Sequence, residues 1–135
     1  MNDITQKERD RRKDLVHCVR TTIRGILPIY DEDETSLMLD YHEFCLQISF
    51  SATHPLMVFT FAHTFKPPYD LKLMNNINKL NLLTVLGCHM LNGQAQCYSY
   101  RSTHWIESEI SEARFNEMLE RCYLDAICGF SQLSG

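Results

Sequence analysis

The sequence predicts an α+β domain with an antiparallel sheet of about five strands, in the chain order helix, three strands, helix, two strands, helix. Two observations indicate this fold class most clearly. Residues 44–51, FCLQISFS, alternate apolar and polar side chains, which is typical of a half-buried strand. Asn92-Gly93 lies between two strand-like segments and is a strong signal for a β-hairpin.

A leading helix is predicted from Thr5 to Ile26. Its second half carries apolar residues at helical spacing, whereas its first half is polar on all sides. Thr5 is followed three residues later by Glu8, which matches a capping box. The acidic run YDEDET at residues 30–35 is then predicted to form an exposed turn.

Three strands are predicted next, at Ser36–Tyr41, Phe44–Ser51 and Leu56–Phe65. The third, LMVFTFAHTF, is apolar on both faces, so both faces need a cover. Helices of the same chain can cover one face. A second subunit or a segment of another protein would then cover the other, and this surplus of apolar strand surface is the main functional indication in the sequence.

A second helix is predicted to begin after the cap residue Asp70. Its buried stripe is predicted to contain Met74, Ile77, Leu80 and, at its end, Leu83. The hairpin follows, with Cys88–Leu91 pairing against Gln94–Trp105. A closing amphipathic helix is predicted over Glu112–Leu133, with Ser111 as its cap.

Length and composition fit one domain. We expect residues 1–135 to form it, with the leading helix at about 5–26 and the sheet and remaining helices within 36–133. The longest apolar runs are too short to span a bilayer, and the charged start does not resemble a signal peptide, so we expect a cytoplasmic location and no membrane partner. The six cysteines form no CxxC pair and are expected to be free and mostly buried.

The hairpin raises the question of a metal or thiol site, because Cys88, His89, Cys97 and His104 lie close together in sequence. Adjacent residues of a strand point to opposite faces, so Cys88 and His89 do not share a site. No spacing matches a known metal framework and no hydrolase or nucleotide motif occurs, so we predict no catalytic residue, no metal and no cofactor. A metal- or thiol-dependent protein that uses Cys88 and Cys97 stays as an alternative.

A second alternative is a DNA-associated regulator that uses the basic leading helix. The segment KERDRRK, which includes Arg11 and Arg12, has the charge to contact phosphates. Acidic residues are interleaved with these basic ones, however, and the whole chain has a net charge of −4. A solvated helix face with internal ion pairs is the favoured interpretation, and nucleic acid is not the favoured partner.

Five residues are the predicted partner-binding anchors. They are Met57, Phe59, Tyr98, Tyr100 and Trp105. Tyrosine and tryptophan are typical interface anchors, and methionine adapts to irregular surfaces. The opposing interpretation, that Tyr98 and Tyr100 pack beneath a helix, is equally consistent with the pattern.

The segment from about Ser36 to Leu133 resembles the YbjN family, which shares the fold of type III secretion chaperones. The similar features are the strand ending MVFTFAHTF, the helix DLKLMNNINKLNLLTVLG with Asn78 and Asn81 flanking Leu80, the hairpin CHMLNGQAQCYSYRS and the closing helix ISEARFNEMLERCYLDAICGF. The resemblance implies a bacterial, non-enzymatic and commonly dimeric protein that binds protein segments. YbjN-like proteins are described as candidate regulators in bacterial signalling.

Together, these observations predict a cytoplasmic, non-enzymatic protein-binding module, chaperone-like or regulatory, that acts as a homodimer. Its partner is expected to be a protein or peptide that buries an apolar segment on exposed sheet and helix surface.

Overall fold

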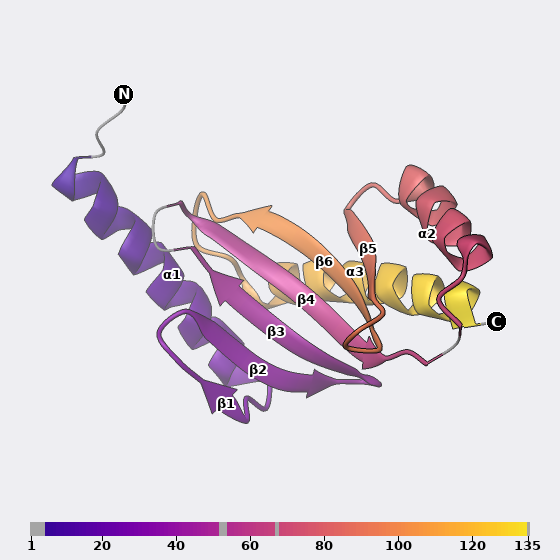
Figure 1. Cartoon of the computed structure of the whole chain (residues 1–135). Helices are drawn as coiled ribbons and strands as arrows, with labels where there is room; N and C mark the ends of the chain where they lie inside the picture. Colours follow the sequence, from indigo (N-terminus) through magenta and orange to yellow (C-terminus); the bar gives the residue numbers. More distant parts are fainter. Residues whose placement is uncertain (1–4, 52–53, 67, 135) are drawn as a thin grey trace.

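The computed structural model describes residues 5–51, 54–66 and 68–134. Its elements are, in chain order, α1 (Gln6–Ile26), β1 (Asp31–Glu32), β2 (Ser36–Tyr41), β3 (Phe44–Phe50), β4 (Leu56–Thr64), α2 (Leu71–Leu83), β5 (Gly87–Asn92), β6 (Cys97–Trp105) and α3 (Glu112–Ser134) (Figure 1). The α+β class is therefore confirmed, whereas the predicted number of strands is wrong.

The described strands form one antiparallel sheet of six strands, in the order β1-β2-β3-β4-β6-β5. The additional strand, β1, lies in the acidic run that the sequence predicts to be an exposed turn. Arg20 and Arg24 of α1 both bind the Glu32 carboxylate, and Arg20 also donates to the carbonyl oxygens of Asp33 and Glu34. These contacts with α1 hold β1 beside β2, so the pairing depends on tertiary structure and has no pattern in the sequence.

The three predicted helix caps are present. Thr5, Asp70 and Ser111 each accept, through the side-chain oxygen, a hydrogen bond of 2.9–3.2 Å from the backbone N–H three residues later. Each bond satisfies a backbone donor that has no partner inside the helix. The starts of all three helices are thus encoded locally.

The β5–β6 connection is a hairpin, as predicted, but its turn differs from the expected two-residue Asn-Gly turn. Four residues, 93–96, join the strands. The Asn92 side chain accepts a hydrogen bond of 3.1 Å from the Ala95 N–H, and Gln96, with φ of 49°, adopts the left-handed conformation. The asparagine therefore stabilises the turn through its side chain.

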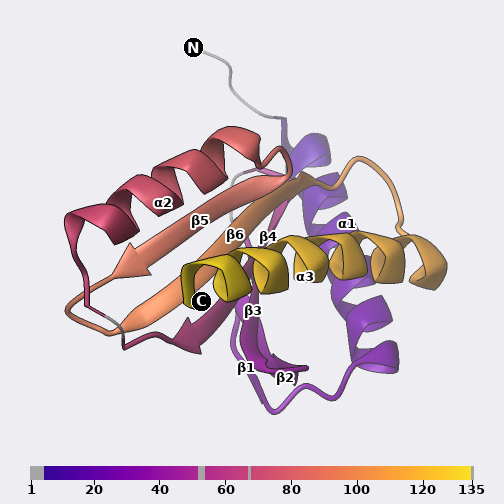
Figure 2. The same cartoon turned by 90° about the vertical axis from the view of Figure 1, so that its right-hand side faces the viewer.

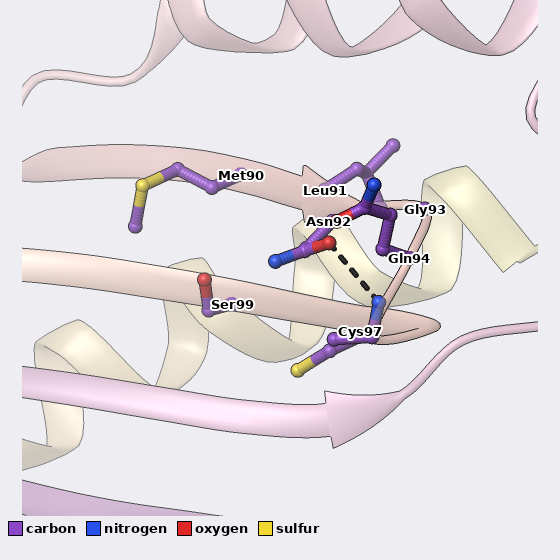
Figure 3. A pocket seen from close by; sticks show the side chains of 8 residues that line it. Met90, Leu91, Asn92, Gly93, Gln94, Cys97 and Ser99 are labelled. Atoms are coloured by element: carbon purple, nitrogen blue, oxygen red, sulfur yellow. Dashed lines mark hydrogen bonds between the residues drawn. The ribbon is translucent and has the colours of Figure 1, made fainter.

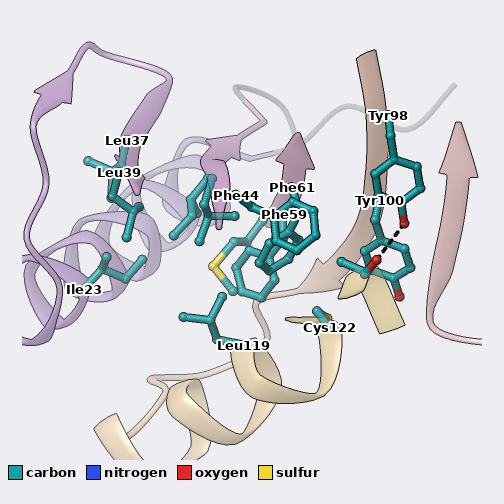
Figure 4. Close-up of a cluster of buried hydrophobic side chains, with 14 of the residues drawn as sticks. Ile23, Leu37, Leu39, Phe44, Phe59, Phe61, Tyr98, Tyr100, Leu119 and Cys122 are labelled. Carbon is teal, nitrogen blue, oxygen red and sulfur yellow. Dashed lines mark hydrogen bonds between the residues drawn. The ribbon is translucent and has the colours of Figure 1, made fainter. Parts of the chain in front are cut away.

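One face of the sheet forms the core with α1 and α3. α3 runs across the sheet and α1 lies next to it (Figure 2). Figure 4 shows side chains from the two helices meeting those of the strands. The strands contribute Leu37, Leu39, Phe44, Leu46, Ile48, Phe50, Met57, Phe59, Phe61, Tyr98 and Tyr100, and the helices contribute Val19, Ile23, Phe115, Leu119, Cys122, Ala126 and Leu133. All of these are buried.

α2 lies beside β5 at the edge of the sheet (Figures 1 and 2). Leu73 and Ile77 are its buried residues. The predicted stripe is therefore partly wrong, because Met74 and Leu83 are exposed. Leucines occur on all sides of this helix, so their spacing leaves more than one choice of buried face.

Candidate partner-binding face

On the second face of the sheet, no helix of the described residues lies in front of the central strands β3, β4 and β6 (Figure 1). We call this surface the open face. Its side chains alternate along each strand with the buried core residues. The open face consists of Met38, Asp40, Cys45, Gln47, Ser49, Leu56, Val58, Thr60, Ala62, Thr64, Cys88, Met90, Cys97, Ser99, Arg101, Thr103 and Trp105, all exposed or half-buried.

Strand register places these side chains in rows. In one row, Ser49 of β3, Val58 of β4 and Thr103 of β6 lie side by side. At the end of the sheet, Trp105 pairs with Leu56. On the described strands β3, β4 and β6, Arg101 is the only charged residue of the open face. The centre of this face therefore consists mainly of small residues, is mildly apolar and carries almost no charge.

Two exposed aromatic residues lie on this surface. Trp105 is 62% exposed at one end. Tyr30, from the segment before β1, is 58% exposed and its hydroxyl lies 3.4 Å from the Cys45 Sγ. That hydrogen bond, together with burial, raises the pKa of Tyr30 to about 12. Tyrosine and tryptophan at such positions are typical anchors for a protein partner.

Two open hollows border the same face. One, of about 380 Å³, is lined by Cys45, Ala62 and Cys97 together with Glu43, His63 and Thr64. The other, of about 740 Å³, lies at the β5–β6 hairpin, where Met90, Ser99 and Cys97 line one side (Figure 3). Neither is an enclosed cavity, so both suit a side chain of a partner better than a small-molecule ligand.

The structure buries four of the five predicted anchors. Met57, Phe59, Tyr98 and Tyr100 are each 0% exposed. They point toward α1 and α3, so they line no surface that a partner can contact while the core is closed. Trp105 is the one predicted anchor that is exposed. Alternation along β4 and β6 separates two sets of side chains, and the buried set is the aromatic one.

The hairpin cysteines and histidines do not converge. Cys88 lies on the open face, whereas His89 is buried on the core face. Across residues 5–51, 54–66 and 68–134, no group of three or more His, Cys, Asp or Glu side chains is placed to hold a metal ion. The six cysteines all lie in this range and are free, but the expectation that most of them are buried is wrong, because Cys122 is the only buried one.

His89 instead joins four elements through hydrogen bonds. Its Nδ1 lies 2.7 Å from the Tyr98 hydroxyl, which donates to the Ala126 carbonyl oxygen of α3 at 3.0 Å. Its Nε2 lies 3.0 Å from the Thr84 hydroxyl at the end of α2. Tyr98 donates its one proton to Ala126, and Thr84 donates to the Leu80 carbonyl oxygen at 2.8 Å, so both ring nitrogens of His89 face hydroxyl oxygens that can accept a hydrogen bond. Burial lowers the pKa of His89, and Asp125 opposes this only in part.

Two further residues shape the junction of α2, β5, β6 and α3 around His89. The Asn81 side chain of α2 accepts from the His89 N–H at 2.7 Å and donates to the His89 carbonyl oxygen at 2.9 Å. It thus occupies the outer edge of β5 as a neighbouring strand would. A Cβ at Gly129 would lie 2.3 Å from the His89 ring, so glycine is needed for this approach of α3.

A second surface was missed by the sequence reasoning. Large apolar side chains are exposed on α2 and on the segment that follows it, and we call this group the α2 ridge. It consists of Leu71, Met74, Leu82, Leu83, Val85 and Leu86. Leu82, Leu83 and Val85 are 84–94% exposed. The run LNLLTVL was the available signal, since it holds more apolar residues than one helix face can bury.

Four of the seven lysine and arginine residues of α1 form ion pairs within the chain. Arg11 and Arg12 bind Glu8, at 2.7 and 3.1 Å. The hydrogen bond from Arg11 is the main cause that lowers the pKa of Glu8 to about 2. Arg20 and Arg24 bind Glu32. Pairing of this kind leaves less positive charge for phosphate contacts than the sequence alone suggests.

Comparisons with known proteins identify the fold. No model of a known protein family matches the chain, and no curated protein matches it. Among solved structures, the chain is similar to YbjN, a candidate transcription regulator from E. coli, with a TM-score of 0.62 and 11% identity, over 82% of this chain and 84% of that one. It is also similar to a chain of the HopA1-SchA chaperone-effector complex, with a TM-score of 0.54 and 13% identity, over 90% of this chain and 94% of that one.

The chain therefore has the YbjN and type III secretion chaperone-like fold, which confirms the resemblance drawn from the sequence. At this level of identity the likeness concerns the fold alone. Within the described residues, no helix is both long and apolar enough to cross a lipid bilayer.

Proposed function

We propose that this protein, with its YbjN and secretion chaperone-like fold, is a cytoplasmic, non-enzymatic module that binds another protein on the open face of its sheet, in a chaperone-like or regulatory role. The observation that supports this most is the open face itself. A sheet face without a helix layer leaves Leu56, Val58 and Met90 only half-buried. A second protein segment would supply the missing layer.

The composition of the open face agrees with this role. Depletion of charge at the centre and enrichment in aromatic residues are the compositional marks of protein interfaces. Here the central strands carry Arg101 as their single charged residue, with Trp105 at one end and Tyr30 near the other side. One of the two neighbouring folds comes from a chaperone-effector complex, which adds support from a protein that binds a protein partner.

The protein acts as a homodimer through the α2 ridge. Exposed leucine and valine side chains such as Leu82 and Val85 are costly in water, and burial against a second copy removes this cost. The ridge lies at the β5 edge, away from the central strands of the open face, so both surfaces are available at once. Dimerisation and partner binding are therefore separable by mutation.

Static light scattering tests the dimer. Wild-type protein is expected at twice the 15.8 kDa of one chain. The double variant Leu82→Glu, Val85→Glu is expected at the mass of one chain, because two carboxylates in the ridge oppose its burial. Leu124→Glu on α3, which is also exposed, is the matched control and should stay dimeric. A wild-type monomer at all concentrations would refute this part of the proposal.

Affinity capture from the native cell tests the open face. Thr60 lies at the centre of β4, so Thr60→Arg places a bulky charge in the middle of the face. Partners retained by wild-type protein should be lost with Thr60→Arg and kept with Arg121→Glu on α3, away from the sheet. Equal capture by both variants would show that the partner binds elsewhere.

A further inference from the structure

Arg101 is an isolated cation in the centre of the open face. It is exposed on β6, and its strand neighbours in register are Thr60 of β4 and Cys88 of β5. In the described part of the chain the ion pairs join Arg11 and Arg12 to Glu8, Arg20 and Arg24 to Glu32, and Arg121 to Glu117. Arg101 takes part in none of these. A guanidinium that lacks an ion pair and has uncharged strand neighbours can bind a carboxylate through two parallel N–H donors.

The backbone of the partner segment is constrained by the face it covers. A sheet face offers side chains, whereas only a sheet edge offers backbone hydrogen bonds. An extended segment laid across the face would bury its own N–H and C=O groups without partners, but a helix satisfies these groups internally. The edges are also poor templates for a partner strand, since Asn81 binds the outer side of β5 at His89 and β1 is short and charged. The face therefore fits a helix.

The dimensions set the length of that helix. From Leu56 to Thr64 the central strand β4 has nine residues. At about 3.3 Å per residue these extend over roughly 26 Å, and a helix of that length has about 18 residues at 1.5 Å per residue. Such a helix would contact Trp105 near one end and Met90 or Cys97 near the other.

We propose, on the basis of the protein-binding function above, that the open face binds an amphipathic helix whose apolar stripe carries one acidic residue, placed to pair with Arg101. Leu56, Val58 and Ala62 contact the apolar side chains of that stripe. Trp105 packs against one of its ends. The acidic residue sets both the specificity and the register of the helix on the sheet.

The single tryptophan makes the test direct, because Trp105 is the only one in the chain and lies on this face. The probes are three capped 18-residue helical peptides with leucine and alanine at i, i+3, i+4, i+7 spacing, which differ only in a central stripe residue, Glu, Gln or Lys. Each is titrated into wild-type protein, Arg101→Gln and the control Arg121→Gln under reducing conditions. Trp105 emission reports binding, and vesicles of phosphatidylglycerol and phosphatidylcholine form a separate arm.

We expect the Glu peptide to bind about tenfold more tightly than the Gln peptide, the scale of one charge-assisted pair, and the Lys peptide to bind weakest. The difference in affinity between the Glu and Gln peptides should vanish in Arg101→Gln and persist in Arg121→Gln. It should also shrink as NaCl rises from about 50 to about 500 mM, because salt screens an exposed charge pair.

Other outcomes overturn the inference in distinguishable ways. Equal binding of all three peptides refutes the acidic residue but leaves a protein-binding face. A Glu preference that survives in Arg101→Gln places the acid-binding site elsewhere. A Trp105 response to the vesicles and to no peptide indicates an anionic membrane surface as the partner. No response of Trp105 to any probe refutes the helix site, while the Thr60→Arg capture judges the proposed function separately.

Discussion

Replacing Tyr98 with phenylalanine is expected to destabilise the protein by about 2–3 kcal/mol, although the ring stays in place. The hydroxyl that is lost lies 2.7 Å from His89 Nδ1 and donates to the Ala126 carbonyl oxygen at 3.0 Å, and Tyr98 is 0% exposed. Each hydrogen bond contributes about 1 kcal/mol net. The buried His89 Nδ1 would also lose its hydrogen-bond partner, which adds a cost of about 1 kcal/mol or more.

Tyr100→Phe is the matched control. It is the same substitution on the same strand and face, and Tyr100 is equally buried. Its hydroxyl makes one hydrogen bond, to the Asp125 carboxylate at 2.9 Å. Asp125 is only half-buried, so its carboxylate can turn to water, and the expected cost is about 1 kcal/mol.

The assay is urea unfolding at pH 7.5, followed by circular dichroism and Trp105 fluorescence, with the slope m compared between variants. Tyr98→Phe should lower the midpoint more than Tyr100→Phe at an unchanged m. If Tyr98→Phe costs no more than Tyr100→Phe, the junction of α2, β5, β6 and α3 is not held by the Tyr98 hydroxyl, and the reasoning is refuted.

Three further predictions concern stability, each measured by urea unfolding. Burial lowers the pKa of His89 and His104 below the ordinary 6.5, so the unfolded chain binds more protons and stability should fall as the pH drops through 6.5; a rise would contradict this. Arg20→Met should cost about 2 kcal/mol, because a nearly buried side chain loses its carboxylate and carbonyl partners on β1 and the segment after it; no loss would show that β1 pairs without it. Gly129→Ala should cost about 1–3 kcal/mol by overpacking. A Cβ at Gly25 in α1 would meet nothing within 4 Å, so Gly25→Ala should stabilise the protein by about 0.5–1 kcal/mol. Equal changes in stability for Gly129→Ala and Gly25→Ala would refute the packing argument.

Much of the fold follows from local signals. Ser36–Tyr41 has the predicted bounds, and the cap residues Thr5 and Asp70 bind where expected. These elements depend on side chains within a few positions of one another, which a sequence pattern records. β1 was missed because its pairing depends on Arg20 and Arg24, which lie on another element.

The functional face was predictable only in part. Alternation along β6 correctly separates Tyr98 and Tyr100 from Ser99 and Arg101, but alternation alone does not say which set faces the helices. Tyr98 and Tyr100 were assigned to a partner-binding surface, but they lie in the core, because large apolar side chains gain most from burial. Trp105 is the exception, because it belongs to the set of side chains on the open face, opposite the helices.

The α2 ridge shows a different limit. Apolar residues surround this helix, so around Ile77 hydrophobic periodicity favours Met74 and Leu83 as readily as Leu73. The choice is made by Asn81, whose side chain must reach the edge of β5 and thereby fixes the rotation of the helix. No single-sequence pattern contains that constraint.

Site-specific photo-crosslinking in the native cell tests the central claim most directly. A photoreactive residue is introduced at Thr60, in the middle of the open face, and in a second strain at Glu117, on the exposed side of α3. The account predicts a discrete crosslinked protein at Thr60 that is absent at Glu117. The absence of any crosslink at Thr60, or the same crosslinked protein at both positions, would contradict it.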